Sequence, residues 1–89
     1  MRRPALVVSG ERFNADHDQA VLAMIASAGH ADWPSDTPIR DLKSASLRMP
    51  SIVRLKVFSM DRRLVLRRIG TLGKKDRKAV RGAVESWLL

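Results

Sequence analysis

Cysteine is absent from this sequence of 89 residues, which excludes disulfide bonds and thiolate metal sites. The two histidines, His17 and His30, are isolated and offer no zinc-ligand spacing, so we expect no metal and no cofactor. No apolar run approaches the ~18 residues of a membrane-spanning helix, and the N-terminus has no secretory signal pattern. These absences predict a protein of the reducing cytoplasm that is not embedded in a membrane.

Aromatic residues are also scarce, at 4% of the chain, so a dedicated surface for stacking nucleic-acid bases is not expected. Trp33 and Phe58 could each stack on a base. Phe13 and Trp87 are expected in the core, because Trp87 lies on the apolar stripe of a predicted helix.

Positive charge is abundant and unevenly distributed. The formal net charge is +8, and with 45% hydrophobic residues the chain is globular rather than disordered. Residues 1–47 hold five Lys and Arg against six Asp and Glu, a net charge of −1, whereas residues 48–89 hold twelve against three, a net charge of +9. No linker separates the halves, so we expect one domain over residues 1–89 with one basic surface that faces a polyanion.

Hydrophobic alternation predicts several strands. Ala5–Ser9 is rich in β-branched residues and predicts a short strand. Ala20–Ser27 is apolar on both alternating faces and predicts a central strand, although a helix remains possible. Ser51–Met60 is the clearest strand, and a hairpin is expected to join it to a second strand at Arg63–Ile69. Thr37–Arg40 is a candidate for a short edge strand.

The pattern changes after Gly70 and Gly73, which are expected to close that hairpin. From Lys74 onward the apolar residues recur with a helical period and predict an amphipathic C-terminal helix that packs on the strands. The members of this stripe are Ala79, Val80, Ala83, Val84, Trp87 and Leu88.

Five pieces of the sequence, in order and in register, resemble the MazF/PemK family of toxins. They are Arg3–Ser9, Phe13–Asn14, Met24–Ser27, Met49–Arg54 and Ile69–Leu72, followed by the closing helix. The resemblance implies an α+β, mainly β fold, an SH3-like, partly open barrel of antiparallel strands with a C-terminal helix. It also implies a homodimer that cleaves single-stranded RNA without a metal and is neutralised by an antitoxin protein.

The sequence departs from the family pattern at three points. Members usually have another strand and a long loop before the Arg-Pro motif, so this chain is expected to lack the family's first strand. The threonine thought to assist catalysis falls on Ala26, which leaves that role empty unless Ser27 fills it. An Arg-x-Asp pair of some members corresponds here to Arg54 and Lys56.

The candidate site residues follow from the resemblance and from the chemistry. Arg3 matches the family's catalytic arginine, and its planar fork suits a scissile phosphate; the less favoured alternative is a solvated residue before a strand. Ser27 is the second catalytic candidate. The cations expected to bind RNA are Arg2, Arg48, Arg54 and Lys56. A surface ion pair is the alternative for Arg54, and either histidine could act as a base from a loop.

We therefore expect a toxin-like endoribonuclease. Two alternatives remain open at this point. One is a catalytically impaired relative that acts by binding nucleic acid or an antitoxin-like partner; Ala26 and the expected lack of the first strand favour it. The other is a small basic nucleic-acid-binding protein unrelated to toxins.

Overall fold

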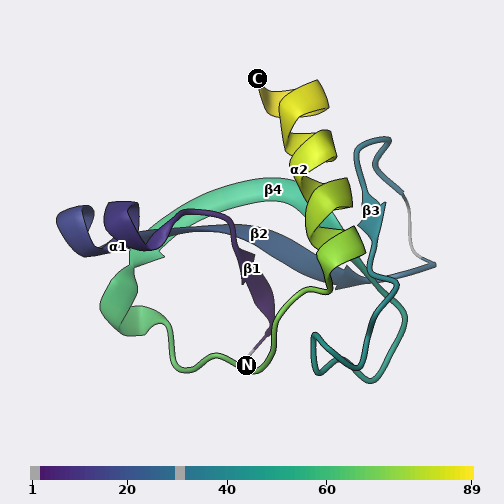
Figure 1. Ribbon diagram of the computed structural model, residues 1–89, viewed down its shortest axis with the longest axis horizontal. Coiled ribbons are helices and arrows are strands. Elements are labelled where there is room, and N and C mark those ends of the chain that lie inside the picture. Colours follow the sequence, from purple (N-terminus) through teal and green to yellow (C-terminus); the bar gives the residue numbers. More distant parts are fainter. Residues whose placement is uncertain (1–2, 30–31) are drawn as a thin grey trace.

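The structure, a computed structural model, describes residues 3–29 and 32–89. Within these residues, four strands and two α-helices follow one another, with a short 3-10 helix, η1, after the last strand (Figure 1). In chain order the elements are β1 (Ala5–Val7), α1 (Glu11–His17), β2 (Gln19–Ser27), β3 (Thr37–Pro38), β4 (Ser51–Asp61), η1 (Arg62–Leu64) and α2 (Lys74–Leu88).

The four strands form one antiparallel sheet in the order β1-β2-β4-β3. The apolar strand β2 lies inside the sheet, as its two apolar faces predict, and the proline-containing β3 lies at an edge, where a missing N–H costs nothing. The sheet is curled, and α2 lies across one side of it (Figure 1). This curled half-barrel with a C-terminal helix confirms the expected fold class.

The pairing of β2 with β4 shifts register at one step. Ala23 lies opposite Val57, but the next residue, Met24, lies opposite Arg54, so Leu55 and Lys56 are extra residues on β4. Residues directly opposite each other in a sheet share a face. Met24 and Arg54 therefore point to one side of the sheet, and Ala23 and Val57 point to the other.

The core lies on the side that α2 covers. Ala23 and Val53 of the sheet pack there with Val80 of α2 and with Ile39 and Leu72 from the connecting segments. The apolar stripe of α2 explains this packing. Only part of the stripe is used, however, because the C-terminal half of the helix projects away from the sheet (Figure 1).

Both aromatic residues that were expected in the core are exposed. Trp87, on the projecting half of α2, is 57% exposed, and Phe13 is 42% exposed. Phe13 lies on α1, a helix that the sequence analysis missed. Its ring packs against His17 with a centroid distance of 4.6 Å, so that histidine ends a helix rather than lying in a loop.

The prediction of a second hairpin strand at Arg63–Ile69 is wrong, because no strand follows β4 among the described residues. The Asp61 side chain accepts a hydrogen bond from the Arg63 backbone N–H at 2.8 Å, which caps η1 and turns the chain out of the sheet. The segment then continues without regular structure to α2. Gly70 does not close a hairpin; a Cβ there would lie 2.6 Å from the backbone of Ala45, so only glycine permits this close approach.

A buried carboxylate joins α2 to the loop after β3. Asp76 lies in the first turn of α2 and is 2% exposed. It accepts hydrogen bonds from the backbone N–H of Arg40 at 3.0 and 3.1 Å and from that of Asp41 at 2.9 Å. These bonds satisfy two backbone donors and fix the start of the helix against the sheet edge. Over the described ranges, neither helix is long and apolar enough to cross a membrane.

Replacing Asp76 by alanine should destabilise the fold by about 2–3 kcal/mol, because charge-assisted hydrogen bonds are lost and backbone donors stay buried. Urea unfolding at neutral pH measures this difference. Glu85→Ala, an exposed change on the same helix, is the matched control and should shift stability by less than about 0.5 kcal/mol. Equal effects of the two substitutions would contradict this role of Asp76.

Candidate nucleic-acid interface

A groove of about 460 Å³ opens where the chain enters β1 and where β2 ends beside the start of β4. We call this cavity the groove. Its lining residues are Arg3, Pro4, Met24, Ile25, Ala26, Ser27, Ser51 and Arg54. The groove therefore brings two arginines and two serines together with apolar residues of β2.

The strand register explains why these residues meet. Met24 lies opposite Ala5 of β1 and opposite Arg54 of β4, so the three share the side of the sheet that α2 does not cover. Arg3 precedes Ala5 by two residues, which in an extended chain places both on the same side. Two arginines far apart in the sequence are thereby brought to one groove.

Arg54 is held in place by an acidic partner. Its Nε donates to Asp36 Oδ1 at 3.0 Å and its Nη2 donates to Oδ2 at 2.8 Å, and these side chains are only 14% and 8% exposed. The guanidinium also lies 5.1 Å from the ring centroid of Trp33. Hydrogen bonds from Arg54 lower the pKa of Asp36, and those bonds raise the pKa of Arg54. The ion pair named as the alternative for Arg54 thus exists, and Arg54 still lines the groove.

Two serines lie opposite each other at the end of the groove. Ser27 ends β2 and pairs with Ser51, which begins β4. The Ser51 hydroxyl donates to the carbonyl of Met49 at 2.8 Å, whereas the Ser27 hydroxyl has no hydrogen-bond partner among the described residues. Ser51 was not a site candidate in the sequence, although it stands in the Met49–Arg54 motif.

The other candidates lie elsewhere. Lys56 and Arg48 are exposed but do not line the groove, and His17 lies on α1. Arg2 and His30 lie outside the described residues. No group of three His, Cys, Asp or Glu side chains that could hold a metal ion is found in residues 3–29 and 32–89.

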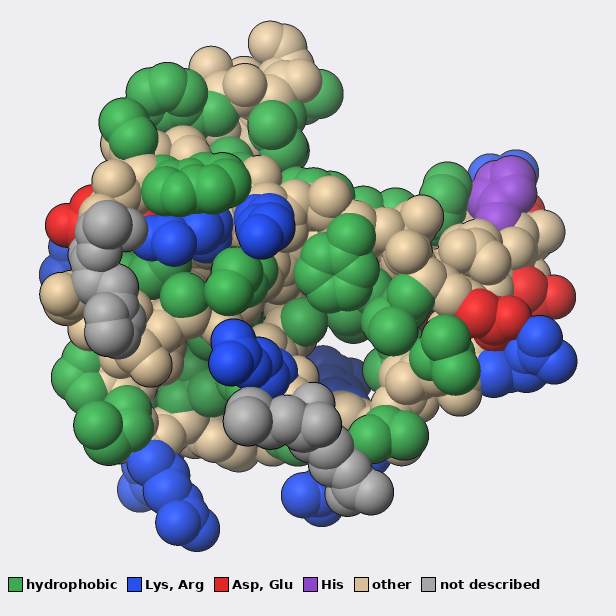
Figure 2. All heavy atoms as spheres, turned by 180° about the vertical axis from the view of Figure 1, so that it is seen from behind, with side chains coloured by type: hydrophobic (Ala, Val, Ile, Leu, Met, Phe, Trp, Pro, Cys, Tyr) green, Lys and Arg blue, Asp and Glu red, His purple; other side chains and the backbone are tan. Residues whose placement is uncertain are grey.

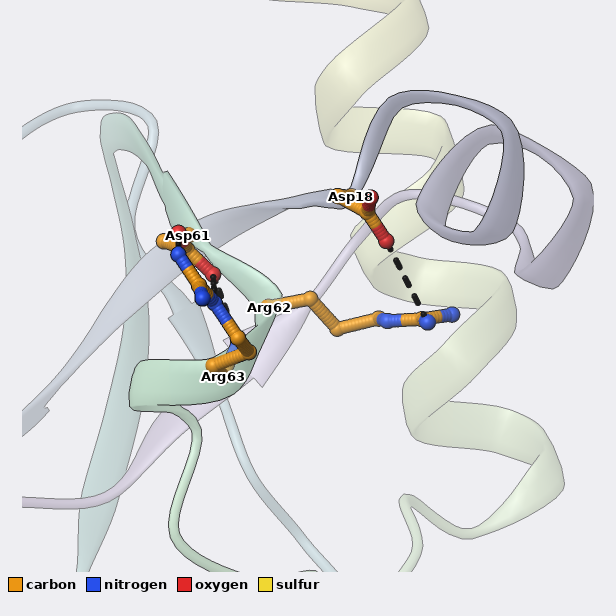
Figure 3. Close-up of polar contacts among 4 residues, drawn as sticks. All are labelled: Asp18, Asp61, Arg62 and Arg63. Atoms are coloured by element: carbon orange, nitrogen blue, oxygen red, sulfur yellow. Dashed lines mark hydrogen bonds and ion pairs between the residues drawn. The ribbon is translucent and has the colours of Figure 1, made fainter.

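Two cations of the basic half are paired at the opposite end of the sheet. Arg62 contacts Asp18 at 3.3 Å and Arg63 contacts Asp61 at 2.8 Å (Figure 3). Within the part of the chain that the structure describes, no ion pair engages the cations of α2, which are Lys74, Lys75, Arg77, Lys78 and Arg81. Five unpaired cations of the basic half thus lie on the C-terminal helix, whereas Arg62 and Arg63 of η1 are paired.

The sequence profile of the PemK-like, MazF-like toxin of type II toxin-antitoxin system matches residues 1–88. The chain belongs to this family. No curated protein matches it in sequence.

Solved structures show the same fold. The Mtb toxin and the Mycobacterium tuberculosis toxin MazF-mt6 are both similar, with a TM-score of 0.78 and 20% sequence identity over 94% of this chain, and they are covered over 90% and 83% of their own lengths. A chain of the MazE-MazF structure from Deinococcus radiodurans has a TM-score of 0.77 and 20% identity over 98% of this chain and 81% of its own. The MazF-like fold is thus retained although the sequence has diverged widely.

The Asp36–Arg54 pair should make stability depend on pH in the acid range. The pKa of Asp36 lies below its ordinary value of 3.8, so the pair contributes stability that is present above this pH and is lost as the pH falls through the lowered pKa. Asp36→Asn should therefore destabilise the protein at neutral pH. The difference from the parent should shrink as the pH falls below about 4, measured by urea unfolding at several pH values.

Asp16→Asn is the control for this series, because Asp16 forms only an exposed pair with Arg12 at 3.7 Å. Its effect should be small at every pH. A stability difference between parent and Asp36→Asn that stays constant down to pH 2 would contradict the proposed cause.

Proposed function

We propose that this MazF/PemK-family toxin is an endoribonuclease that cleaves single-stranded RNA without a metal, with the groove as its active site. The observation that carries the proposal is the meeting of Arg3 and Arg54 with Ser27 in one groove. Family membership supports the choice of substrate class, and neither it nor the fold favours the catalytically impaired alternative.

The proposed reaction is a transesterification of the RNA phosphodiester. The ribose 2′-oxygen attacks phosphorus while the bond to the 5′-oxygen breaks, leaving a 2′,3′-cyclic phosphate and a 5′-hydroxyl. Negative charge builds on the non-bridging oxygens during this step. Arg3, which has no acidic partner among the described residues, supplies a full positive charge and a planar pair of donors to these oxygens.

Arg54 has a different part in this proposal. Asp36 neutralises much of its charge, but the bidentate pair fixes the direction of the guanidinium at the groove wall. Arg54 is thus suited to orienting the RNA backbone, whereas Arg3 is suited to stabilising the transition state. Fixed donors need no reorganisation during the reaction, which is the main source of electrostatic catalysis.

Proton transfer is assigned to Ser27. A guanidinium offers only donors and no acceptor, so neither Arg3 nor Arg54 can accept the 2′-proton. The Ser27 hydroxyl has no partner within the described structure, so it is suited to relay the 2′-proton to water, while a second proton from water goes to the departing 5′-oxygen. Ala26 beside it has no hydroxyl, so this relay lacks a second member.

The same family membership supports three further parts of the proposal. We infer an antitoxin protein as partner, a homodimer as the active form and the cytoplasm as the compartment. The family consists of toxins of type II toxin-antitoxin systems, and one similar structure contains MazE with MazF.

Arg3→Ala should lower the rate of RNA cleavage by about 10²–10³-fold, the usual cost of removing one donor to a developing oxyanion. The assay uses a long single-stranded RNA with a chelator present, and gel analysis of the products. Arg12→Ala, which removes an exposed arginine from α1, is the control and should cleave like the parent. Cleavage by Arg3→Ala at the parent rate would refute the assignment of Arg3.

Ala26→Thr should raise the cleavage rate, because it places a hydroxyl on the groove wall beside Ser27. Single-turnover rates with the same RNA measure the gain, and Ala26→Val, similar in shape but without the hydroxyl, is the matched control. A gain in both variants would point to packing rather than to proton transfer. No gain in either would show that Ser27 already fills the role.

A further inference from the structure

The side of the sheet that carries the groove also carries two exposed aromatic residues, which the proposed chemistry does not use. Trp33 is 42% exposed and Phe58 is 44% exposed. Side chains of this size are normally buried, because each can hide a large apolar area. Their position beside the groove therefore calls for a ligand with an apolar face.

The register fixes Phe58 on the same side of the sheet as Arg54. Leu22 lies opposite Phe58 and Met24 lies opposite Arg54, and Leu22 and Met24, two residues apart on β2, share a face. Phe58 follows Arg54 by four residues along β4, a span of at most about 13 Å. An aromatic ring thus lies beyond the groove along the strand.

Trp33 comes from the segment before β3, contacts Arg54 and is hydrogen-bonded to Asp36. Its indole stacks on the Arg54 guanidinium, its backbone N–H donates to Asp36 Oδ2 at 2.9 Å, and its carbonyl accepts from the Asp36 N–H at 3.0 Å. One carboxylate therefore orients both the arginine and the tryptophan. A fixed ring needs little ordering when it binds a flat ligand.

The charge on the side of the sheet that carries the groove indicates which kind of ligand would bind there. Seen from behind, the side of the sheet not covered by α2 shows basic side chains among hydrophobic ones, and the acidic ones lie toward the ends (Figure 2). Alternation of cations and aromatic rings matches single-stranded nucleic acid, whose backbone is anionic and whose unpaired bases have flat apolar faces. A protein partner would need no such alternation.

We propose that Trp33 and Phe58 are base-stacking positions that flank the groove, so that unpaired bases of single-stranded RNA stack on the two rings while Arg3 and Arg54 contact the phosphates between them. This inference rests on the proposed function. It adds a binding track that is longer than the groove and that gives the protein a preference for unpaired strands, since bases in a duplex have no free faces to stack.

The test compares two single-stranded oligonucleotides of equal length, one with bases and one wholly abasic. Both are made of 2′-deoxy residues, so neither can be cleaved, and binding is measured by fluorescence anisotropy. The parent should bind the oligonucleotide with bases more tightly. Trp33→Leu and Phe58→Leu should each reduce this preference by about 5- to 150-fold, and Trp33→Phe should retain most of it.

The controls separate stacking from folding and from charge. Trp87→Leu and Phe13→Leu remove aromatic residues of similar exposure from α2 and α1 and should leave the preference unchanged. Arg3→Ala should weaken binding of both oligonucleotides equally. If the parent preference persists in the Trp33→Leu, Phe58→Leu double variant while RNA is still cleaved, the stacking proposal fails and the proposed function stands. If the parent neither binds nor cleaves single strands, both fail.

Discussion

The pairing of β2 with β4 is the interaction on which the rest of the molecule depends. It runs from Gln19 opposite Asp61 to Ser27 opposite Ser51, the longest pairing in the sheet. One side of this ribbon supplies the core residues Ala23 and Val53, and the other side supplies Met24 and Arg54. A slip of one residue would exchange the two sides, so the hydrophobic core and the groove are fixed by the same register.

Two acidic residues stabilise the structure by accepting hydrogen bonds from backbone N–H groups or from an arginine side chain. Asp76 is buried and tied to two backbone N–H groups, and Asp36 is tied to Arg54 and to the backbone of Trp33. Each carboxylate joins segments that are far apart in the sequence. A small domain buries little apolar surface, so such charge-assisted hydrogen bonds provide a larger share of its order than in a large protein.

Much of the fold could be predicted from sequence because alternation and helical period are local signals. Strands β1, β2 and β4 and helix α2 were all predicted within a few residues. A hairpin strand was also predicted at Arg63–Ile69, but it does not form, because the cap that Asp61 provides to η1 overrides the alternating pattern. Helix α1 was missed because none of its residues is buried, so it carries no apolar stripe.

The groove could be predicted only in part. Arg3, Ser27 and Arg54 were selected from the sequence, and the structure places them together. The link between Arg54 and Asp36 could not be predicted, because the two residues are 18 positions apart and lie on separate segments. The position of Ser51 beside Ser27 could not be predicted either, because it depends on the register of β4 against β2. Contacts of this kind depend on tertiary pairing rather than on local pattern.

Much of the unpaired positive charge of the protein lies away from the groove. Arg3 comes from the half of the chain whose net charge is −1, whereas five cations of the basic half that have no ion pair among the described residues lie on α2, which covers the other side of the sheet. At physiological salt the charges on α2 are screened beyond about 8 Å. They can therefore raise the rate of encounter with a polyanion, but they contribute little to contacts within the groove. Selectivity for a particular strand must arise from the groove and from the side chains that flank it.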